Sequence, residues 1–429
     1  MISKNKFQSL NVIGLGYIGL PTAAVFASRK IRVCGVDINK ETVNTINRGE
    51  IHIVEPDLDI AVHSTVKEGF LKASLTPESS DAFIIAVPTP FKDKKQPDLS
   101  CVEAAVSNIA PVLKKGDLII LESTSPVGTT EHMAKGLAEF RSDLRIPTLN
   151  RSEGDFDVFI AHCPERVLPG RVMRELVENA RIIGGMTKKC AEMARELYKI
   201  FVNGDCLLTD VRTAEMAKLT ENAFRDVNIA FSNELSLISD KIGINVWELI
   251  NLANRHPRVN ILQPGCGVGG HCIAVDPWFL VSASPELARI TRVAREVNDS
   301  KPEWVVAKIS KEVSKMLEGG ALCSAEEITI ACFGLTFKPD IDDLRESPAL
   351  EITKRVAAEH AGKVLAVEPH IGEDCFLGSD DLNFFLSNIT EALEQADILV
   401  MLVDHKEFKS IDKYLLSGKK IIDTKGIWK

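Results

Sequence analysis

The segment 264–272 (PGCGVGGHC) places a cysteine where it could act as a nucleophile. Four of the six residues from Gly265 to Gly270 are glycine, so this backbone can bring its N–H groups close to an anion or a sugar. Cys272 ends the run beside His271, and Asp276 follows four residues later. A thiol at the start of a helical turn can have a lowered pKa and attack a carbonyl carbon.

Two other interpretations of Cys272 have to be weighed. Most free cysteines are small buried residues, and Cys272 taken alone fits that description as well. A cysteine next to a histidine could also bind a metal ion, but a zinc site needs three or four ligands at a recognised spacing. No such set of ligands is visible around Cys272, so we expect no metal.

A second group of polar side chains recurs at helical spacing. Lys218, Asn222 and Arg225 lie at positions i, i+4 and i+7 of AEMAKLTENAFRDVNIAFSNELSLI, which puts them on one face of a helix. Their neighbours are mostly apolar, so this face could border a cleft, where a lysine can exchange protons with a substrate. A plain solvated face explains the pattern equally well.

The N-terminal segment carries a dinucleotide-binding fingerprint. Gly14, Gly16 and Gly19 form G-x-G-x-x-G between a strand-like run and a helix-like run, and the next strand-like run ends in Asp37. The glycines permit a tight turn, close approach of a pyrophosphate and close helix packing, and the helix N-terminus supplies N–H groups to the phosphates. Asp37 would bind the ribose hydroxyls and repel a 2′-phosphate, which favours NAD over NADP. The alternative is a glycine turn of an unrelated α/β fold.

These residues require a scaffold of parallel strands and helices. Strands are expected at 10–13, 31–36, 83–87, 118–121, 328–333, 363–367, 398–403 and 420–422, because each is apolar enough to be buried on both faces. Helical spacing dominates 213–242 and 285–317. We therefore predict an α/β protein with two Rossmann-like doubly wound domains joined by a central helical domain.

The predicted domains are an NAD-binding domain at 1–209, a central helical domain at 210–317 and a second Rossmann-like domain at 318–429. The last has only Gly334 at its first strand–helix turn, so it need not hold NAD. Lys338 and Arg345, beyond that strand, suit a diphosphate. This third domain is therefore expected to bind a diphosphate-containing ligand.

Composition removes several classes of function. The net charge is 51 − 60 = −9, which argues against nonspecific nucleic-acid binding. The longest apolar runs are too short to cross a bilayer, and the N-terminus shows no secretory signal, so we expect a cytoplasmic protein. Ten cysteines without a Cys-x-x-Cys pair are expected to be thiols.

Together these segments resemble the UDP-glucose/GDP-mannose dehydrogenase family over essentially the whole chain and in the same order. The matching segments are GLGYIGLP, ESTSPVGTT, CPERVLPG, AKLTENAFRDVNIAFSNE, GVGGHC and FGLTFKPDIDDLRESPA. CPERVLPGR, NRHPRVNILQPG and AVDPWF resemble the branch that oxidises N-acetylhexosamine nucleotides. Where UDP-glucose enzymes usually carry a Pro-Glu-Phe-Leu type of segment, this chain has Pro164-Glu165-Arg166-Val167.

The resemblance implies a four-electron oxidation of a sugar C6 alcohol to a carboxylate, with two molecules of NAD used in turn. The expected substrate is UDP-N-acetyl-D-mannosamine, for bacterial surface polysaccharide synthesis. UDP-N-acetylglucosamine is the alternative, because the shape of the pocket selects the C2 epimer. In this chemistry a cysteine captures the aldehyde as a thiohemiacetal, a second hydride transfer gives a thioester, and water releases the acid.

The resemblance also implies a role for individual residues. Cys272 is the nucleophile, Lys218 handles the alcohol proton or stabilises the oxyanion, and Asn222 donates to that oxygen. Asp276 lies near the lysine and the water, Glu165 serves thioester hydrolysis, and Thr124 supports the water and the cofactor. The implied NAD contacts, besides the three glycines, are Tyr17, Ile18, Asp37, Thr89, Thr130 and Arg345. The implied substrate contacts, besides Lys218 and Asn222, are Arg166, Val167, Arg225, His256, Arg258, Gly269, Phe337, Lys338 and Lys425.

Family members are dimers or larger, and Arg258 lies in a segment that can reach across an interface, so a homodimer is expected. Two other functions remain as alternatives. A two-electron hydroxyacid dehydrogenase also pairs a Rossmann domain with a helical lysine, but the third α/β domain and GGHC count against it. A non-enzymatic NAD-binding protein would not need Lys218 and Cys272.

Overall fold

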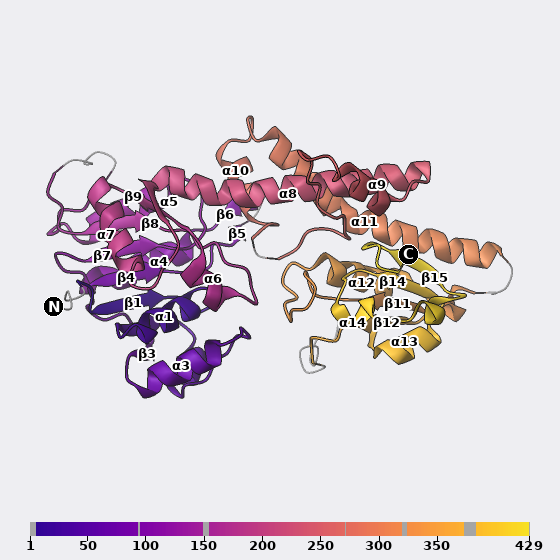
Figure 1. Cartoon of the computed structure of the whole chain (residues 1–429), viewed down its shortest axis with the longest axis horizontal. Helices are drawn as coiled ribbons and strands as arrows, with labels where there is room; N and C mark the ends of the chain where they lie inside the picture. The colour runs from indigo at the N-terminus through magenta and orange to yellow at the C-terminus, as the bar shows by residue number, and fades with distance from the viewer. Residues whose placement is uncertain are drawn as a thin grey trace. The chain divides into compact units, whose positions relative to one another are not determined.

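A computed structural model describes residues 6–92, 95–148, 154–270, 272–319, 324–372 and 383–428. The chain divides into two compact units, Met1–Glu221 and Asn222–Lys429 (Figure 1). No helix in the described ranges is long and apolar enough to cross a bilayer.

The first unit is built on an eight-stranded sheet with the strand order β10-β9-β8-β7-β4-β1-β2-β3. Neighbouring strands are parallel except for β8 and β9, which are antiparallel. The strands are β1 (Ser9–Ile13), β2 (Arg32–Val36), β3 (Leu71–Ser74), β4 (Ala82–Ile85), β7 (Leu118–Leu121), β8 (Phe159–His162), β9 (Arg181–Gly185) and β10 (Cys206–Asp210). A separate antiparallel pair, β5 (Phe91–Lys92) and β6 (Gln96–Pro97), follows β4.

Helices cover both faces of this sheet, so each central strand contributes to two apolar cores. Leu118 and Ile120 of β7 belong to one core, and Ile119 and Leu121 belong to the other. This alternation of buried side chains confirms the two-sided burial predicted from the apolar runs. The helices are α1 (Gly19–Ser28), α2 (Lys40–Asn47), α3 (Leu58–Lys67), α4 (Ser100–Ile109), α5 (Thr129–Phe140), α6 (Val172–Glu178) and α7 (Lys188–Tyr198), with a 3₁₀ turn at Ala110–Val112.

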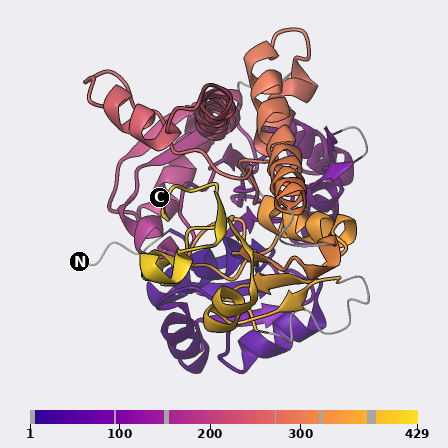
Figure 2. The ribbon, with the colours of Figure 1, turned by 90° about the vertical axis from the view of Figure 1, so that its right-hand side faces the viewer.

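Long helices follow the first sheet. The longest, α8 (Val211–Ile242), contains neither Gly nor Pro and stops at Gly243, whose φ of +75° a helix cannot accommodate. Next come α9 (Val246–Ala253), which Asn245 caps by accepting hydrogen bonds from two main-chain N–H groups, and α10 (Asp276–Ala283). Helix α11 (Arg289–Glu318) packs along α12 (Pro348–Glu359) (Figure 2).

The second unit contains an all-parallel five-stranded sheet with the order β13-β12-β11-β14-β15. Its strands are β11 (Ile330–Phe333), β12 (Val364–Val367), β13 (Phe385–Leu386), β14 (Ile398–Met401) and β15 (Lys420–Asp423). Its other helices are α12, α13 (Ile389–Gln395) and α14 (Lys406–Lys409), with 3₁₀ turns at Ala325–Glu327 and Lys413–Leu416. Ile330 and Cys332 face one core, and Ala331 and Phe333 face the other.

The predicted fold class is confirmed, and each of the eight predicted strands coincides with an observed strand within about two residues at either end. Strands β3, β5, β6, β8, β9, β10 and β13 were not predicted. Most of them are short or exposed: β10, for example, has no buried residue, so its sequence lacks the apolar run on which the prediction relied. The domain boundaries at 209/210 and 317/318 remain a prediction.

Candidate functional site

The turn between β1 and α1 has the geometry that the glycine fingerprint predicts. Gly14 has a φ of +91°, and a Cβ on it would lie 2.5 Å from the Ala86 carbonyl oxygen. A Cβ on Gly19 would lie 1.8 Å from the Gly14 carbonyl oxygen, whereas one on Gly16 would meet nothing within 4 Å. The first and third glycines therefore serve the turn and the packing, and the second faces open space. Among the described residues, no side chain caps the N-terminus of α1, so its first N–H groups suit a pyrophosphate.

Asp37 follows β2 and holds this turn in place. Its Oδ2 accepts a hydrogen bond from the Leu15 N–H at 3.0 Å, and its Oδ1 accepts one from the Asn39 N–H at 2.9 Å. The carboxylate is only partly buried, so its remaining lone pairs can accept bonds from ribose hydroxyls. The flanking Tyr17 and Ile18 are also partly exposed. The glycines, Tyr17, Ile18 and Asp37 thus form a cradle that fits NAD.

The strand ends next to this turn carry the predicted hydroxyl groups. The Thr89 hydroxyl donates to the Thr124 carbonyl oxygen at 2.7 Å, which joins the segments that follow β4 and β7. Thr130 is fully buried, and its hydroxyl donates to Glu215 at 2.7 Å. Thr89 and Thr124 lie at the carboxyl ends of parallel strands, where ligands bind in open α/β sheets. Thr130 instead attaches the start of α5 to Glu215 in α8. Its contact with NAD remains a prediction.

Glu165 is held by a charged network inside the first unit. It follows β8, and its Oε2 accepts a hydrogen bond from the Arg181 guanidinium at 2.7 Å. Its Oε1 accepts one from the Arg166 N–H at 2.6 Å. The Arg181 guanidinium also donates to Glu122 at 2.9 Å, and the side chains of Arg181 and Glu122 are almost fully buried. One buried cation thus lies between two carboxylates.

Tyr198 and Thr22 also bind Glu122, and the Thr22 hydroxyl donates to its Oε2 at 3.4 Å. The Tyr198 hydroxyl donates to Glu122 at 3.0 Å, and its ring lies 4.3 Å from the Arg181 guanidinium carbon. Burial raises the pKa of Glu122 to about 7, against the opposing effect of Arg181 and with a further rise from Glu165. Burial alone would lower the pKa of Arg181, but the surrounding acidic groups raise it above its ordinary value, so Arg181 stays charged.

The second unit brings Cys272, Asp276 and Asn222 together. Cys272 is exposed, and its carbonyl oxygen accepts a hydrogen bond from the Asp276 N–H at 2.8 Å, at the start of α10. The Asn222 amide donates to the Asp276 carboxylate at 2.5 Å, and both side chains are buried. Two of the predicted catalytic residues are therefore fixed next to the turn that carries the exposed thiol. His271, expected beside Cys272, lies outside the described residues.

The glycine loop before Cys272 packs tightly against the segment after β11. A Cβ on Gly269 would lie 2.2 Å from the Glu346 carbonyl oxygen, and one on Gly270 would lie 2.7 Å from the Phe337 ring. The Gly270 N–H donates to the Arg345 carbonyl oxygen at 3.2 Å. At these positions glycine is needed so that two pieces of backbone can approach each other. The contacts join Gly269, Phe337 and Arg345, which the resemblance assigns to ligand binding.

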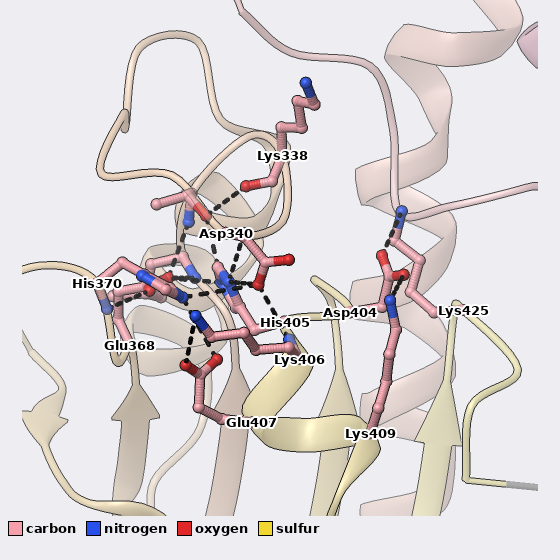
Figure 3. Close-up of polar contacts among 12 residues, drawn as sticks. Lys338, Asp340, Glu368, His370, Asp404, His405, Lys406, Glu407, Lys409 and Lys425 are labelled. Carbon is pink, nitrogen blue, oxygen red and sulfur yellow. Dashed lines mark hydrogen bonds and ion pairs between the residues drawn. The ribbon is translucent and has the colours of Figure 1, made fainter. Parts of the chain in front are cut away.

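Two predicted cationic contacts follow strands of the second sheet. Lys338, expected at a diphosphate, lies after β11, and Lys425, expected at the substrate, lies after β15. The Lys338 side chain points away from the polar cluster beneath it, while Lys425 lies 3.8 Å from Asp404 (Figure 3). A Cβ on Gly265 would lie 3.1 Å from the Lys425 ammonium, so that lysine also contacts the glycine loop. Arg345 forms an ion pair with Asp343 at 2.6 Å.

The polar cluster below Lys338 is the group in the described ranges whose side chains could hold a metal ion. The ligand atoms of Asp340, His370, His405 and Glu407 lie within 4.8 Å of one another (Figure 3). However, Nδ1 of the buried His405 accepts the Asp340 N–H at 3.0 Å, and Nε2 lies 3.2 Å from the Glu368 carboxylate. Because both nitrogens of His405 have partners, the cluster is better described as a brace between the ends of β11, β12 and β14.

The other predicted residues lie in α8 and in the segment after α9. Lys218 is partly buried and Arg225 is exposed, both on the α8 face that also carries Asn222. His256 and Arg258 are exposed beyond α9. In the first unit, Arg166 forms an ion pair with Glu221 at 2.8 Å, and Val167 packs against the apolar core. The roles implied for all these residues remain predictions.

The sequence reasoning missed Arg181, Glu122 and Tyr198. A charge that opens an apolar run, as in Arg181-Ile-Ile-Gly-Gly, was the available signal, because such a residue in a buried strand needs a partner. Glu122 lies in the ESTSPVGTT segment, where the resemblance assigns a role to Thr124 but none to Glu122. Nothing local in the sequence pairs these residues.

Comparisons with known proteins agree with this geometry. Three models of the UDP-glucose/GDP-mannose dehydrogenase family match the chain: the NAD binding domain at residues 8–202, the central domain at 212–300 and the UDP binding domain at 331–429. The chain is 60% identical over 424 residues to a UDP-N-acetyl-D-mannosamine dehydrogenase of Escherichia coli (strain K12), covering 99% of this chain and 100% of that one. It is 59% identical over 422 residues to an NDP-N-acetyl-D-galactosaminuronic acid dehydrogenase of Ralstonia nicotianae, covering 98% and 96%.

Solved structures give the same result. A UDP-D-ManNAc dehydrogenase from Pyrococcus horikoshii superposes with a TM-score of 0.86 at 40% identity, covering 98% of this chain and 96% of that one. The fold and the glycine cradle define a nucleotide-dependent oxidoreductase. The chain belongs to the UDP-glucose/GDP-mannose dehydrogenase family, and it carries the NAD binding domain of that family, so NAD is its cofactor.

The raised pKa of Glu122 predicts a pH-dependent stability. The folded protein keeps this proton up to about pH 7, whereas an unfolded chain releases it near the ordinary glutamate pKa of 4.5. Between these pH values the folded state binds more protons, so the free energy of unfolding falls as pH rises, on the order of 1 kcal/mol per pH unit. Glu122→Gln removes this loss, so thermal melting at pH 5 to 8 should show the variant gaining stability relative to wild type as pH rises. Glu103→Gln, at an exposed site, should show no such trend, and parallel melting curves for Glu122→Gln would contradict the assignment.

Proposed function

We propose that this protein oxidises the C6 alcohol of UDP-N-acetyl-D-mannosamine to the carboxylate, through a covalent intermediate on Cys272. The observation that carries the proposal is Cys272 itself. Of the eight cysteines in the described ranges it is the exposed one, and its turn is bonded to Asp276 and through it to Asn222. The identity of about 60% to mannosamine dehydrogenases over the whole chain supports the choice of sugar.

In the proposed mechanism, bound NAD supplies the acceptor for each of the two hydrides. Lys218 takes the proton of the C6 hydroxyl in the first oxidation, and Asn222 donates a hydrogen bond to the oxygen. The Cys272 thiol then adds to the aldehyde carbon as its proton passes to the aldehyde oxygen. The resulting thiohemiacetal loses its hydroxyl proton to solvent and its C6 hydrogen as the second hydride, and becomes a thioester. Glu165 takes a proton from water as the water adds to the thioester carbonyl. The carbon–sulfur bond breaks, and the free thiol and the uronate result.

The second unit supplies the UDP-sugar site in this proposal. The first two strands of its sheet, β11 and β12, repeat the arrangement of β1 and β2 in the NAD-binding sheet. Glu368 directly follows β12, as Asp37 directly follows β2. The Glu368 side chain is only 1% exposed and lies against His405, so it cannot also bind ribose hydroxyls. Lys338 and Lys425 remain as cations for the diphosphate. This supports UDP, rather than a second NAD, as the ligand of this unit.

The galacto epimer is a second candidate sugar. The relative from Ralstonia nicotianae is almost as similar as the mannosamine enzymes, and it is named for N-acetyl-D-galactosaminuronic acid.

We place the reaction in the cytoplasm, where NAD and nucleotide sugars occur, and we expect no nucleic-acid or membrane partner.

A homodimer completes the proposal, and an apolar stripe on α8 supports it. Phe224, Phe231, Ile238 and Ile242 are 70%, 48%, 48% and 60% exposed and recur every seven or four residues, which puts them on one helix face. An apolar stripe of this kind on a helix typically packs against another protein surface. The exposed Arg258 lies in the segment expected to reach the partner subunit.

Substrate assays test the sugar. Purified protein with NAD and UDP-N-acetylmannosamine should give two NADH and one uronate per sugar, and UDP-glucose should react much more slowly. The gluco and galacto N-acetylhexosamine nucleotides serve as competitors in the same assay. One NADH per sugar would overturn the four-electron reaction, and a higher kcat/KM with another epimer would reassign the substrate.

Replacement of the nucleophile tests the mechanism. Cys272→Ser should abolish release of the uronate, because a hydroxyl is a much poorer nucleophile than a thiolate near neutral pH. NADH stoichiometry and mass spectrometry of the protein would measure this. Cys266→Ser, in the same loop but with a buried side chain, should cost stability and leave the stoichiometry at two. Full uronate production by Cys272→Ser would eliminate the assignment.

A charge on the α8 stripe tests the dimer. Phe231→Glu should convert the wild-type dimer to a monomer in light-scattering chromatography, because a carboxylate inside an apolar interface is strongly disfavoured. Lys311→Glu, at an exposed site on α11, should leave the dimer intact. A monomeric wild-type protein, or a dimeric Phe231→Glu variant, would remove the stripe as the interface.

A further inference from the structure

The network around Arg181 is an expensive arrangement for a protein core. The side chains of Glu122, Arg181 and Glu165 are 0%, 4% and 9% exposed. A guanidinium between two carboxylates leaves one negative charge in excess when both acids are ionised, and burial of charge costs several kcal/mol per ion even with partners present. Apolar residues of similar volume would stabilise the fold at least as well. This cost suggests that the network has a role in the chemistry.

Glu165 is the most exposed member of the network, although only 9% of its side chain is accessible, and both of its oxygens are restrained. Arg181 binds Oε2 at 2.7 Å and the Arg166 N–H binds Oε1 at 2.6 Å. Two hydrogen bonds to different oxygens fix the rotation of a carboxylate about its last bond. The remaining lone pairs then point in set directions, as a group that accepts a proton from water requires.

Arg181 is itself held on three sides. Its second amino group binds Glu122, and its plane lies against the ring of Tyr198, whose hydroxyl binds the same Glu122 oxygen. The planar fork of an arginine can bind two carboxylates at fixed angles, whereas the single ammonium of a lysine cannot reproduce that geometry. Glu122 directly follows β7, Arg181 begins β9 and Tyr198 ends α7, so the rigid core of the first unit sets the direction of the guanidinium.

We propose that Arg181, braced by Glu122 and Tyr198, is a positioning residue that orients the Glu165 carboxylate for hydrolysis of the Cys272 thioester. The proposal rests on the function proposed above. Arg181 takes no part in either hydride transfer, and it does not touch the reacting atoms. Its effect is confined to the step in which Glu165 receives the proton of the attacking water and the sulfur leaves the acyl carbon.

Arg181→Lys keeps the charge and removes the fork. The two hydride transfers should proceed at nearly the wild-type rate, giving a burst of two NADH per active site. Hydrolysis should then slow about 10- to 100-fold, a part of the roughly 10²–10⁴-fold that a general base contributes. Stopped-flow absorbance should show the burst, and intact-mass spectrometry should show the acyl-enzyme accumulating on Cys272.

A double-mutant cycle separates positioning from general damage to the fold. If Arg181 acts through Glu165, then Arg181→Lys should slow hydrolysis little further in a Glu165→Gln background. Arg141→Lys is the matched control, since Arg141 is a largely buried arginine of the same unit that binds Asp143 and two carbonyl oxygens. It should lower the melting temperature without an NADH burst or an acyl-enzyme.

If Arg181→Lys does not fold, Tyr198→Phe tests the same positioning role. It removes one hydroxyl from the brace and should give the same burst with a smaller slowing of hydrolysis. Equal slowing of hydride transfer and hydrolysis, or additive effects of Arg181→Lys and Glu165→Gln, would overturn the positioning role. A wild-type protein that forms no acyl-enzyme with any UDP-sugar would instead overturn the proposed function, so the two failures are distinguishable.

Discussion

A carboxylate at the end of the second strand holds the turn after the first strand in both sheets of this protein. In the NAD-binding sheet, Asp37 accepts the Leu15 N–H at 3.0 Å. In the second sheet, Glu368 accepts the Leu335 N–H at 2.7 Å. The turn sets where the following segment starts and which N–H groups face a ligand, so the ligand-binding edge of each sheet depends on this one contact.

The two carboxylates differ in their exposure, and this difference explains why the two sheets suit different ligands. Asp37 stays partly exposed and can also bind a ribose, and Gly16 in the same turn leaves open space for the pyrophosphate. Glu368 is closed off by His405, and its hydrogen bonds with His405 and main-chain N–H groups keep its pKa below the ordinary value although burial opposes this. The same backbone plan therefore presents a dinucleotide site in one sheet and a braced loop with Lys338 in the other.

Buried charge organises the remainder of the first unit. Arg181 joins β9 to Glu165 after β8 and to Glu122 after β7, and β8 and β9 are the one antiparallel pair of that sheet. The reversal brings the start of β9 close to the residues that follow β8. In an all-parallel continuation the start of β9 would lie at the opposite edge, and Arg181 could not reach Glu165.

The sequence by itself determined what depends on local pattern: the buried parallel strands, the glycine turn, Asp37, and the nucleophile candidate at the end of a glycine run. Each of these follows from neighbours a few residues away, because periodicity and turn chemistry are short-range. Only the tertiary structure decided the partners of Glu165. Strand order and one antiparallel pairing bring Glu122, Glu165 and Arg181 together. The free-energy cost of burying these charges, and the fixed orientation of their side chains, arise only once the core has excluded water around them.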